Sequence, residues 1–236
     1  MEQEPKPYTL TLTQKKIIAY QTMEFRFEKP HDFIYRAGQS MRFTVPALGE
    51  ERTFSIITAP HELDLAFAMR VRGSAFKKYV RQLKRGETIV ASGPFGTFGL
   101  QEDATKPALY IAGGIGITIF ISMLSHLRYT RQNHPITVLY SNRNEEDISY
   151  ADYLKEIEQT SPHVRVVYTL TNEKPKVWSG ELSRINENLI KKYAPLYTET
   201  LFLIAATPAM VESMEILLHN IGVLDENIKT KRFRGY

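Results

Sequence analysis

The chain has 236 residues, of which 43% are hydrophobic and 24% charged, as in ordinary globular proteins. Thirty Lys and Arg residues against 26 Asp and Glu residues give a net charge of +4, too small an excess to indicate a nucleic-acid-binding protein. The lack of cysteine excludes disulfides, thiol catalysis and Cys-ligated zinc or iron–sulfur clusters within this chain. The polar N-terminal segment, and the glycines that interrupt the longest apolar stretch at residues 108–124, lead us to expect a cytoplasmic protein without a membrane span.

The first hundred residues predict an antiparallel β-barrel. Residues 8–13 alternate apolar and polar side chains, which is the pattern of a half-buried strand. Further short strands are predicted at residues 23–28, 41–45, 54–57 and 63–71. One helix interrupts them at residues 75–83, where apolar side chains recur at helical spacing. Many short strands separated by turn signals are typical of a barrel.

The pattern changes after residues 101–107, a polar segment that we interpret as a linker. Strands are then predicted at residues 108–112, 136–141, 164–170, 200–205 and 228–231, and helices at residues 118–131, 150–160, 181–191 and 209–221. Such alternation builds a parallel sheet with helices on both faces. We therefore expect two domains: an antiparallel β-barrel in residues 1–102 and a parallel α/β, Rossmann-like domain in residues 103–236.

The first motif with chemical content is Arg-Thr-Phe-Ser at residues 52–55. An arginine is suited to a bidentate grip on phosphate. Phe54 follows Arg52 by two residues and so shares its strand face, where it could lie against a flat ring. The hydroxyl of Ser55 could hydrogen-bond a heteroatom of that ring. On its own the motif is equally compatible with an ordinary strand that carries one surface arginine.

The second motif runs from a strand through a glycine turn into a helix, at residues 69–76. Backbone N–H groups at a helix start bind anions, and Arg70 and Arg72 add positive charge nearby. Ser74 is also a suitable N-cap. The two interpretations are compatible, because caps and phosphates use the same end of a helix.

Three further segments are turn-rich. Gly-Pro-Phe-Gly at residues 93–96 reads as a turn that closes a strand. Ala-Gly-Gly-Ile-Gly-Ile-Thr at residues 112–118 follows a buried strand and opens a helix, which is the context of a dinucleotide-binding turn, although the third Rossmann glycine is absent. Ala-Ala-Thr-Pro-Ala-Met at residues 205–210 also joins a strand to a helix, with Pro208 suited to the first helical turn.

The order of these motifs resembles the ferredoxin–NADP⁺ reductase superfamily of two-domain FAD-containing reductases, over about residues 8–236. The matched patterns are R-x-[YF]-S at 52–55, G-P-x-G at 93–96, A-G-G-x-G-[IV]-T at 112–118, C-G-P-x-x-M at the place of 205–210, and the F-x-G-Y ending at 233–236. The resemblance implies an FAD-dependent oxidoreductase without an iron–sulfur domain. Hydride would pass between NAD(P)H and flavin, and electrons would pass to a separate acceptor such as ferredoxin, flavodoxin or an oxygenase component.

The resemblance also implies roles for individual residues. Ser55 would act near the reactive flavin nitrogen, Thr118 near the nicotinamide, and Tyr236 would stack on the flavin. The residues implied for FAD binding are Arg52, Thr53, Phe54, Ser55, Thr58, Arg70, Val71, Gly73, Ser74, Ala75, Phe76 and Tyr236. Those implied for NAD(P)H binding are Gly113, Gly114, Gly116, Thr118, Ser141, Asn142, Arg143, Pro208 and Met210.

The departures from the family pattern all fall on the nucleotide side. Ile119 stands where the family has proline, and Ala205, Ala206 and Thr207 replace the Cys-Gly-Pro of the later motif. They motivate an alternative hypothesis: a non-catalytic or partner-reduced FAD-binding subunit that no longer uses NAD(P)H efficiently.

The choice of nucleotide and of partner is suggested by positive charge. Ser141 and Arg143 could hold a 2′-phosphate, which slightly favours NADPH, although a solvated Arg143 beside an acidic run is equally compatible. Lys77, Lys78, Arg81, Lys84 and Arg85 form a basic helix face. We interpret this face either as a solvated surface or as a docking site for an acidic carrier such as ferredoxin or flavodoxin. The six histidines lack ligand spacing, so no metal site is expected.

Overall fold

The computed structural model of the chain describes residues 5–233. They form two compact units. The first, which we call the barrel unit, comprises the chain up to Leu100 together with Thr118–His126. The second, the sheet unit, comprises Gln101–Ile117 and the chain from Leu127 onward. Each unit is considered by itself below.

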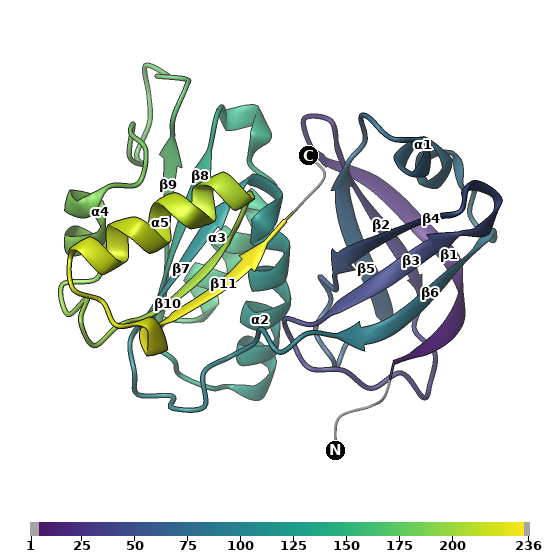
Figure 1. Ribbon diagram of the computed structural model, residues 1–236, viewed down its shortest axis with the longest axis horizontal. Coiled ribbons are helices and arrows are strands. Elements are labelled where there is room, and N and C mark those ends of the chain that lie inside the picture. Colours follow the sequence, from purple (N-terminus) through teal and green to yellow (C-terminus); the bar gives the residue numbers. More distant parts are fainter. Residues whose placement is uncertain (1–4, 234–236) are drawn as a thin grey trace. The chain divides into compact units, whose positions relative to one another are not determined.

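The barrel unit is a six-stranded antiparallel sheet, as the alternating sequence pattern predicts (Figure 1). Its strands are β1 (Lys6–Ala19), β2 (Thr22–Glu28), β3 (Ser40–Val45), β4 (Glu50–Ser55), β5 (Asp64–Arg70) and β6 (Thr88–Phe95), in the order β4-β3-β6-β1-β2-β5. Helix α1 (Ala75–Gln82) lies between β5 and β6 in the sequence. A hydrogen bond of 2.8 Å from Ile57 N to Ala66 O links the chain just beyond β4 to β5, which brings the two edges of the sheet together.

Aromatic side chains fill the interior of the barrel unit. Phe27 and Phe67 stack with ring centroids 5.7 Å apart, and Phe43 contacts Phe67 at 4.3 Å. Successive strand residues point to opposite sides, so the alternating pattern of the sequence delivers these rings to one side. Helix α1 adds Phe76 and Val80 to the same cluster, which explains its helical spacing of apolar residues.

Two expectations about the barrel unit are wrong. The strand predicted at residues 54–57 is instead β4, which ends at Ser55. The Gly-Pro-Phe segment is not a turn but the last part of β6, with a cis bond between Gly93 and Pro94. A Cβ on Gly93 would lie 3.1 Å from Met41 Cγ, so this glycine permits close packing inside the sheet. Only Gly96, with φ of 91°, turns the chain.

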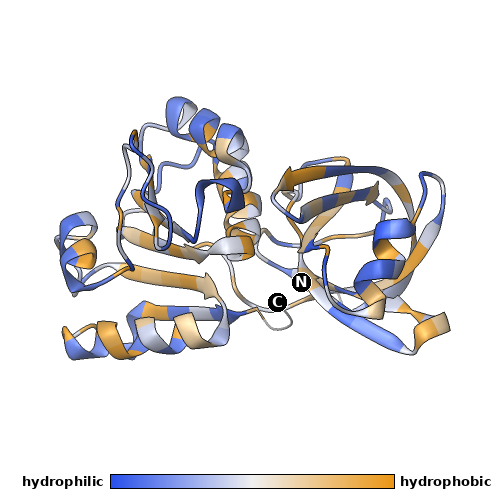
Figure 2. Ribbon diagram, turned by 90° about the horizontal axis from the view of Figure 1, so that it is seen from above, coloured by the Kyte–Doolittle hydropathy of each residue, from blue (hydrophilic) through white to orange (hydrophobic). Residues whose placement is uncertain are grey.

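The sheet unit is a five-stranded parallel sheet with helices on both faces, as predicted (Figure 1). Its strands are β7 (Ala108–Gly113), β8 (Ile136–Asn142), β9 (Val164–Leu170), β10 (Leu201–Ala206) and β11 (Ile228–Arg232), in the order β11-β10-β7-β8-β9. Its helices are α3 (Ala151–Thr160), α4 (Glu187–Tyr193) and α5 (Pro208–Asn220), together with the two ends of α2 (Ile117–Thr130), whose residues Thr118–His126 belong to the barrel unit. Helices α4 and α5 cover one face of the sheet and share a hydrophobic core with it. The inner strands β7 and β10 are apolar and buried almost throughout, as strands that are covered on both faces require, whereas the edge strand β11 is mostly polar (Figure 2).

The helix predicted at residues 181–191 is wrong at its start. Helix α4 begins at Glu187, because Asn186 caps it by accepting a hydrogen bond of 3.1 Å from Leu189 N. Glu181 instead pairs with β9, since its carbonyl accepts a hydrogen bond of 3.0 Å from Leu170 N. A Cβ on Gly180 would lie 2.4 Å from Tyr168 O, so this glycine permits the extended approach.

Candidate functional site

The Arg-Thr-Phe-Ser motif lies on β4, at an edge of the barrel sheet. Arg52 is exposed and donates to Glu50 Oε2 at 2.8 Å and to Glu51 O at 2.7 Å. Phe54, on the same strand face, is half-buried and stacks on Phe67 with centroids 4.5 Å apart. The expected alternation of Arg52 and Phe54 is therefore present, but one side of the Phe54 ring is already occupied by the barrel core.

Ser55 carries a polar atom that the protein leaves without a partner. Its side chain is 4% exposed, and its Oγ makes no hydrogen bond to any residue that the structure describes. A buried hydroxyl without a partner carries a desolvation penalty of about 1–3 kcal/mol. The residues present therefore fit a ligand that supplies a hydrogen-bonding heteroatom at the end of β4, which is what a flavin ring offers.

The turn before α1 has the geometry of an anion site. Gly73 adopts φ of 101°, a conformation open to glycine, and no atom lies within 4 Å of the position of its missing Cβ. Ser74 caps the helix by accepting a hydrogen bond of 3.4 Å from Lys77 N. The first N–H groups of α1 have no partners within the helix. They would suit the oxygens of a phosphate.

Cationic side chains converge on this helix start. Burial lowers the pKa of Lys77, and the positive charges of three nearby arginines lower it further. These arginines are Arg52, Arg72 and Arg70. The Arg52 Cζ atom also lies 5.9 Å from the centre of the Phe76 ring, which ties β4 to α1. The structure thus brings the first two sequence motifs together, and mutually repelling cations favour a bound polyanion such as a diphosphate.

Lys77 is the residue that the sequence interpretation misplaced. It was grouped with the exposed basic face, but it is only 8% exposed and lies at the edge of the buried stripe of α1. A signal was present, because Lys77 precedes the buried Val80 by three residues and therefore shares part of its helix face. The other four members, Lys78, Arg81, Lys84 and Arg85, are exposed as expected.

The remaining residues suggested for FAD binding differ in accessibility. The Thr58 hydroxyl is used within the fold, because it accepts hydrogen bonds from Ala66 N and Tyr35 Oη, both at 3.3 Å. The Phe76 side chain is fully buried in the barrel core, so only its backbone could reach a ligand. Thr53 lies on the strand face opposite to that of Arg52 and is exposed. Val71 is half-buried, and Ala75 is exposed.

In the sheet unit, the glycine turn is built on close approach. A Cβ on Gly116 would lie 1.9 Å from Ala205 O, and one on Gly113 would lie 2.6 Å from Met210 Sδ. Gly114 adopts φ of 51°, and a short 3₁₀ turn over Gly114–Gly116 leads into α2. The turn at the end of β7 thus lies tightly against β10, and its bare backbone is available to a phosphate at the start of α2.

Asn142 closes β8 with a side chain that the protein leaves without partners. It is 4% exposed, and neither its Oδ1 nor its Nδ2 has a hydrogen-bond partner in the described part of the chain. Its backbone carbonyl is occupied by a hydrogen bond of 3.0 Å from Thr171 N. The flanking Ser141 is half-buried and Arg143 is exposed. Ligands of open α/β sheets bind at this carboxyl edge, so the free amide fits a polar ligand group there.

An acidic rim follows Asn142 and was missed in part by the sequence interpretation. Asn144, Glu145 and Glu146 line a hollow together with Asn172 and Glu173. Glu173 accepts a hydrogen bond of 2.7 Å from Glu145 N and so joins the loops after β8 and β9. Its position is predictable only from the neighbouring placement of these two strands. No group of three possible metal ligands occurs in residues 5–233.

In the motif at residues 205–210, the residues that depart from the family pattern lie at the end of β10 and at the start of α5. Ala205 and Ala206 are fully buried within β10 rather than exposed in a turn. Thr207 caps α5 by accepting a hydrogen bond of 3.4 Å from Met210 N, and Pro208 is the first helical residue. Met210 is half-buried against the position of Gly113.

Near the start of α2, Thr118, which is expected to lie near the nicotinamide, is only 2% exposed. Its neighbour Ile119, which replaces the proline of the family pattern, is fully buried. Tyr236, to which a stacking role was assigned, lies outside the described residues. Among those residues, no helix is both long and apolar enough to cross a bilayer.

Known proteins resemble both the sequence and the fold. A family described as the oxidoreductase NAD-binding domain matches residues 110–215. Ferredoxin–NADP reductase B of Sorangium cellulosum is 32% identical over 201 residues, which cover 82% of this chain and 81% of that protein. Reductase component 1 of a terephthalate 1,2-dioxygenase from a Comamonas species is 27% identical over 188 residues, which cover 78% of this chain but only 55% of the relative.

A solved structure shares the architecture with low sequence identity. The ferredoxin NADP⁺ reductase of Neisseria gonorrhoeae, with bound FAD and NADP, superposes with a TM-score of 0.83 at 19% identity. The match covers 96% of this chain and 98% of that one. The sequence relationship to the Sorangium protein, together with this fold, shows that the chain belongs to the ferredoxin–NADP⁺ reductase superfamily and is an oxidoreductase.

Proposed function

We propose that the chain is an FAD-dependent NAD(P)H oxidoreductase that passes electrons to a separate protein acceptor. Residues 1–102 bind FAD and residues 103–236 bind NAD(P)H. The observation that carries the proposal is the group of cations around the start of α1, where Lys77 is buried near Arg52, Arg70 and Arg72 and Arg52 lies 5.9 Å from the Phe76 ring. A bound flavin supplies the chemistry of accepting a hydride and releasing electrons singly or in pairs.

On the flavin side, side-chain charge and backbone donors share the diphosphate. Arg52, Arg70 and Lys77 neutralise it, while the N–H groups of Gly73, Ser74 and Ala75 donate hydrogen bonds to it. Ser55 hydrogen-bonds the ring edge with its otherwise unpartnered hydroxyl. Phe54, which is half-buried, presents its exposed part to the cofactor.

On the nucleotide side, binding relies on close approach of the backbone rather than on charged side chains. Gly113, Gly114 and Gly116 bring bare backbone to the diphosphate, and Thr118 orients the nicotinamide. Pro208 and Met210 border the same edge of the sheet, because Gly113 lies directly against Met210. Asn142 hydrogen-bonds a polar group of the nucleotide with its unpartnered amide.

We assign a slight preference for NADPH over NADH. Ser141 and Arg143 follow β8, where a 2′-phosphate is recognised in this kind of fold. The preference is small because Arg143 is followed by the acidic rim, and the carboxylates of Glu145 and Glu173 in that rim repel the 2′-phosphate of NADPH. Arg143→Ala should therefore lower the affinity for NADPH about tenfold and leave that for NADH unchanged.

The acceptor is an acidic electron-carrier protein such as ferredoxin or flavodoxin. The names of relatives as a ferredoxin reductase and as an oxygenase reductase component support a protein acceptor. We place its docking on the exposed residues Lys78, Arg81, Lys84 and Arg85. Lys15 adds to this positive region, because its ammonium group donates to the carbonyls of Arg81 and Leu83, both at 2.7 Å.

The decisive experiment is anaerobic mixing of the FAD-loaded protein with NADPH and, separately, with NADH, followed by the flavin absorbance. Fast bleaching, with NADPH moderately preferred, is the expected result. Firm FAD binding without bleaching by either nucleotide would contradict the proposal and favour a subunit that receives electrons from a partner.

The docking assignment has its own test. The double variant Lys78→Glu and Arg81→Glu should slow reduction of an acidic carrier while leaving flavin bleaching by NADPH unchanged. The control Lys174→Glu and Lys176→Glu reverses the same charge at exposed positions of the sheet unit. The wild-type rate should also fall steeply with added salt. A salt-independent rate would exclude electrostatic docking.

A further inference from the structure

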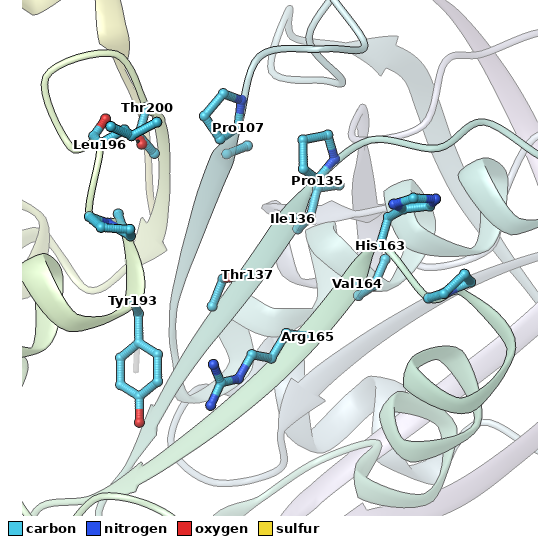
Figure 3. Close-up of a pocket in the computed structure, with 14 residues that line it drawn as sticks. Pro107, Pro135, Ile136, Thr137, His163, Val164, Arg165, Tyr193, Leu196 and Thr200 are labelled. Carbon is cyan, nitrogen blue, oxygen red and sulfur yellow. Dashed lines mark hydrogen bonds between the residues drawn. The ribbon is translucent and has the colours of Figure 1, made fainter.

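The sheet unit holds a second cavity, at the edge of the sheet opposite to the glycine turn. It lies at the amino-terminal ends of β7, β8 and β9, and the segment that follows α4 forms another of its walls (Figure 3). Its volume is about 230 Å³. None of the residues assigned to FAD or NAD(P)H lines it, so it is independent of the proposed function.

The walls of this cavity are mainly apolar. Pro107 and Pro135 lie at the starts of β7 and β8, and Leu196 approaches from beyond α4 (Figure 3). Pro162, which precedes β9, and Ala194 also line the cavity. The backbone groups around these prolines are already used. Pro107 O and Pro135 O each accept a hydrogen bond of 2.9 Å from a strand residue, and His163 O does the same. The walls therefore offer ring and methyl surface rather than hydrogen bonds.

Positive charge stands at the mouth of the cavity. No hydrogen bond or ion pair joins the guanidinium of Arg165 to any residue in the described part of the chain, and its Cζ lies 5.1 Å from the centre of the Tyr193 ring. His163 also lines the cavity. The nearby carboxylate of Glu181 is engaged by Lys192 at 2.7 Å and by the Tyr193 hydroxyl, so it does not neutralise Arg165.

We propose that this cavity binds a small aromatic carboxylate. The ring lies against the prolines, and the carboxylate receives a forked pair of hydrogen bonds from Arg165. The volume falls below the roughly 300–1,000 Å³ of pockets that hold drug-sized ligands, which limits the ligand to about one ring. A bare inorganic anion would leave the apolar walls in water, and a neutral ring would make no charged hydrogen bond to Arg165.

Amide NMR spectra of the FAD-loaded full chain, titrated with benzoate, test this assignment. We expect saturable shifts confined to residues near Ile136, Val164 and Thr200, with a dissociation constant on the order of 1 mM. Benzyl alcohol and acetate, which each carry one half of the ligand, should bind about tenfold more weakly or not at all. Shifts that do not saturate, that lie elsewhere, or that benzyl alcohol reproduces with equal affinity would overturn the proposal.

Variants separate the charge from the apolar walls. Arg165→Gln should weaken benzoate binding about tenfold or more, while Arg184→Gln, a change at another exposed arginine of the same unit, should leave it unchanged. Leu196→Glu places a negative charge at the mouth and should abolish binding. Leu196 is 58% exposed, so the fold should tolerate the change, and an unaltered thermal midpoint would verify this. Full binding by Arg165→Gln would contradict the role of the guanidinium.

Discussion

The barrel unit and the sheet unit each carry a candidate diphosphate site, and the two are built in different ways. Around the start of α1, the proposed recognition relies on charged side chains, three arginines and the buried Lys77. At the end of β7, the proposed recognition relies on the absence of side chains, since a Cβ on Gly116 would collide with Ala205 O. Charge acts over several ångströms and tolerates adjustment, whereas close approach fails with a single methyl group. The comparison predicts that equivalent mutations will have unequal consequences.

Gly116→Ala should give the largest effect. Its Cβ would lie 1.9 Å from Ala205 O, a backbone atom inside the sheet, so β10 or α2 must shift. We expect a loss of about 3 kcal/mol in the free energy of unfolding. Flavin bleaching by NADPH should slow about 100-fold. The control Gly222→Ala, with no atom within 4 Å of its Cβ, should show only the backbone strain of its φ of 89°. Similar loss in both variants would refute the role of close approach.

Arg52→Ala should break the charged site without breaking the fold. Its ion pair with Glu50 is solvent-accessible, so stability should change little. FAD affinity, measured by fluorescence titration, should fall about 30- to 100-fold, because one charged hydrogen-bonding group on the diphosphate is lost. Arg42→Ala is the matched control, since Arg42 is an exposed arginine of the adjacent strand with its own pairing to Glu51. Equal affinities in the two variants would remove Arg52 from the FAD site.

The effect of Ser55→Ala on the free energy of unfolding should have opposite signs without and with bound FAD. Without FAD, the variant loses a buried hydroxyl that has no partner, so its free energy of unfolding should rise by about 1 kcal/mol. With FAD bound, the same change should lower stability and slow bleaching by NADPH about tenfold. Ser122→Ala is the contrast, because that hydroxyl donates to Thr58 O at 2.7 Å and its loss should destabilise both forms. A loss of stability in FAD-free Ser55→Ala would show that the hydroxyl is paired within the protein.

The smallest effect concerns the pH dependence of the FAD-free protein. Burial and neighbouring cations lower the pKa of Lys77 below its ordinary value of 10.5. Between the lowered pKa and 10.5, the unfolded chain binds more protons than the folded one, so stability should rise with pH. Urea unfolding at a series of alkaline pH values should show this rise in the wild type and lose it in Lys77→Met. Lys78→Met, at the adjacent exposed position, should keep it; an unchanged slope in Lys77→Met would contradict the assignment.

Local periodicity was sufficient to predict most elements, and motif order was sufficient to predict the superfamily, while the residues assigned to the two candidate sites stay predictions. The failures share a physical cause, which is that contacts between distant segments override local preference. Residues 181–186 look helical, yet Glu181 pairs with β9. Lys77 looks like a surface lysine, yet it is buried beside arginines from two other segments. Likewise, the absence of partners for Asn142 becomes visible only when its neighbours in space are known.

Phe233 has a practical consequence for handling the protein. Its backbone N–H donates a hydrogen bond of 2.8 Å to Ala206 O, so this residue is held at the carboxyl edge of the parallel sheet. A reporter group placed at Phe233 would therefore lie beside the edge where the nucleotide is proposed to bind.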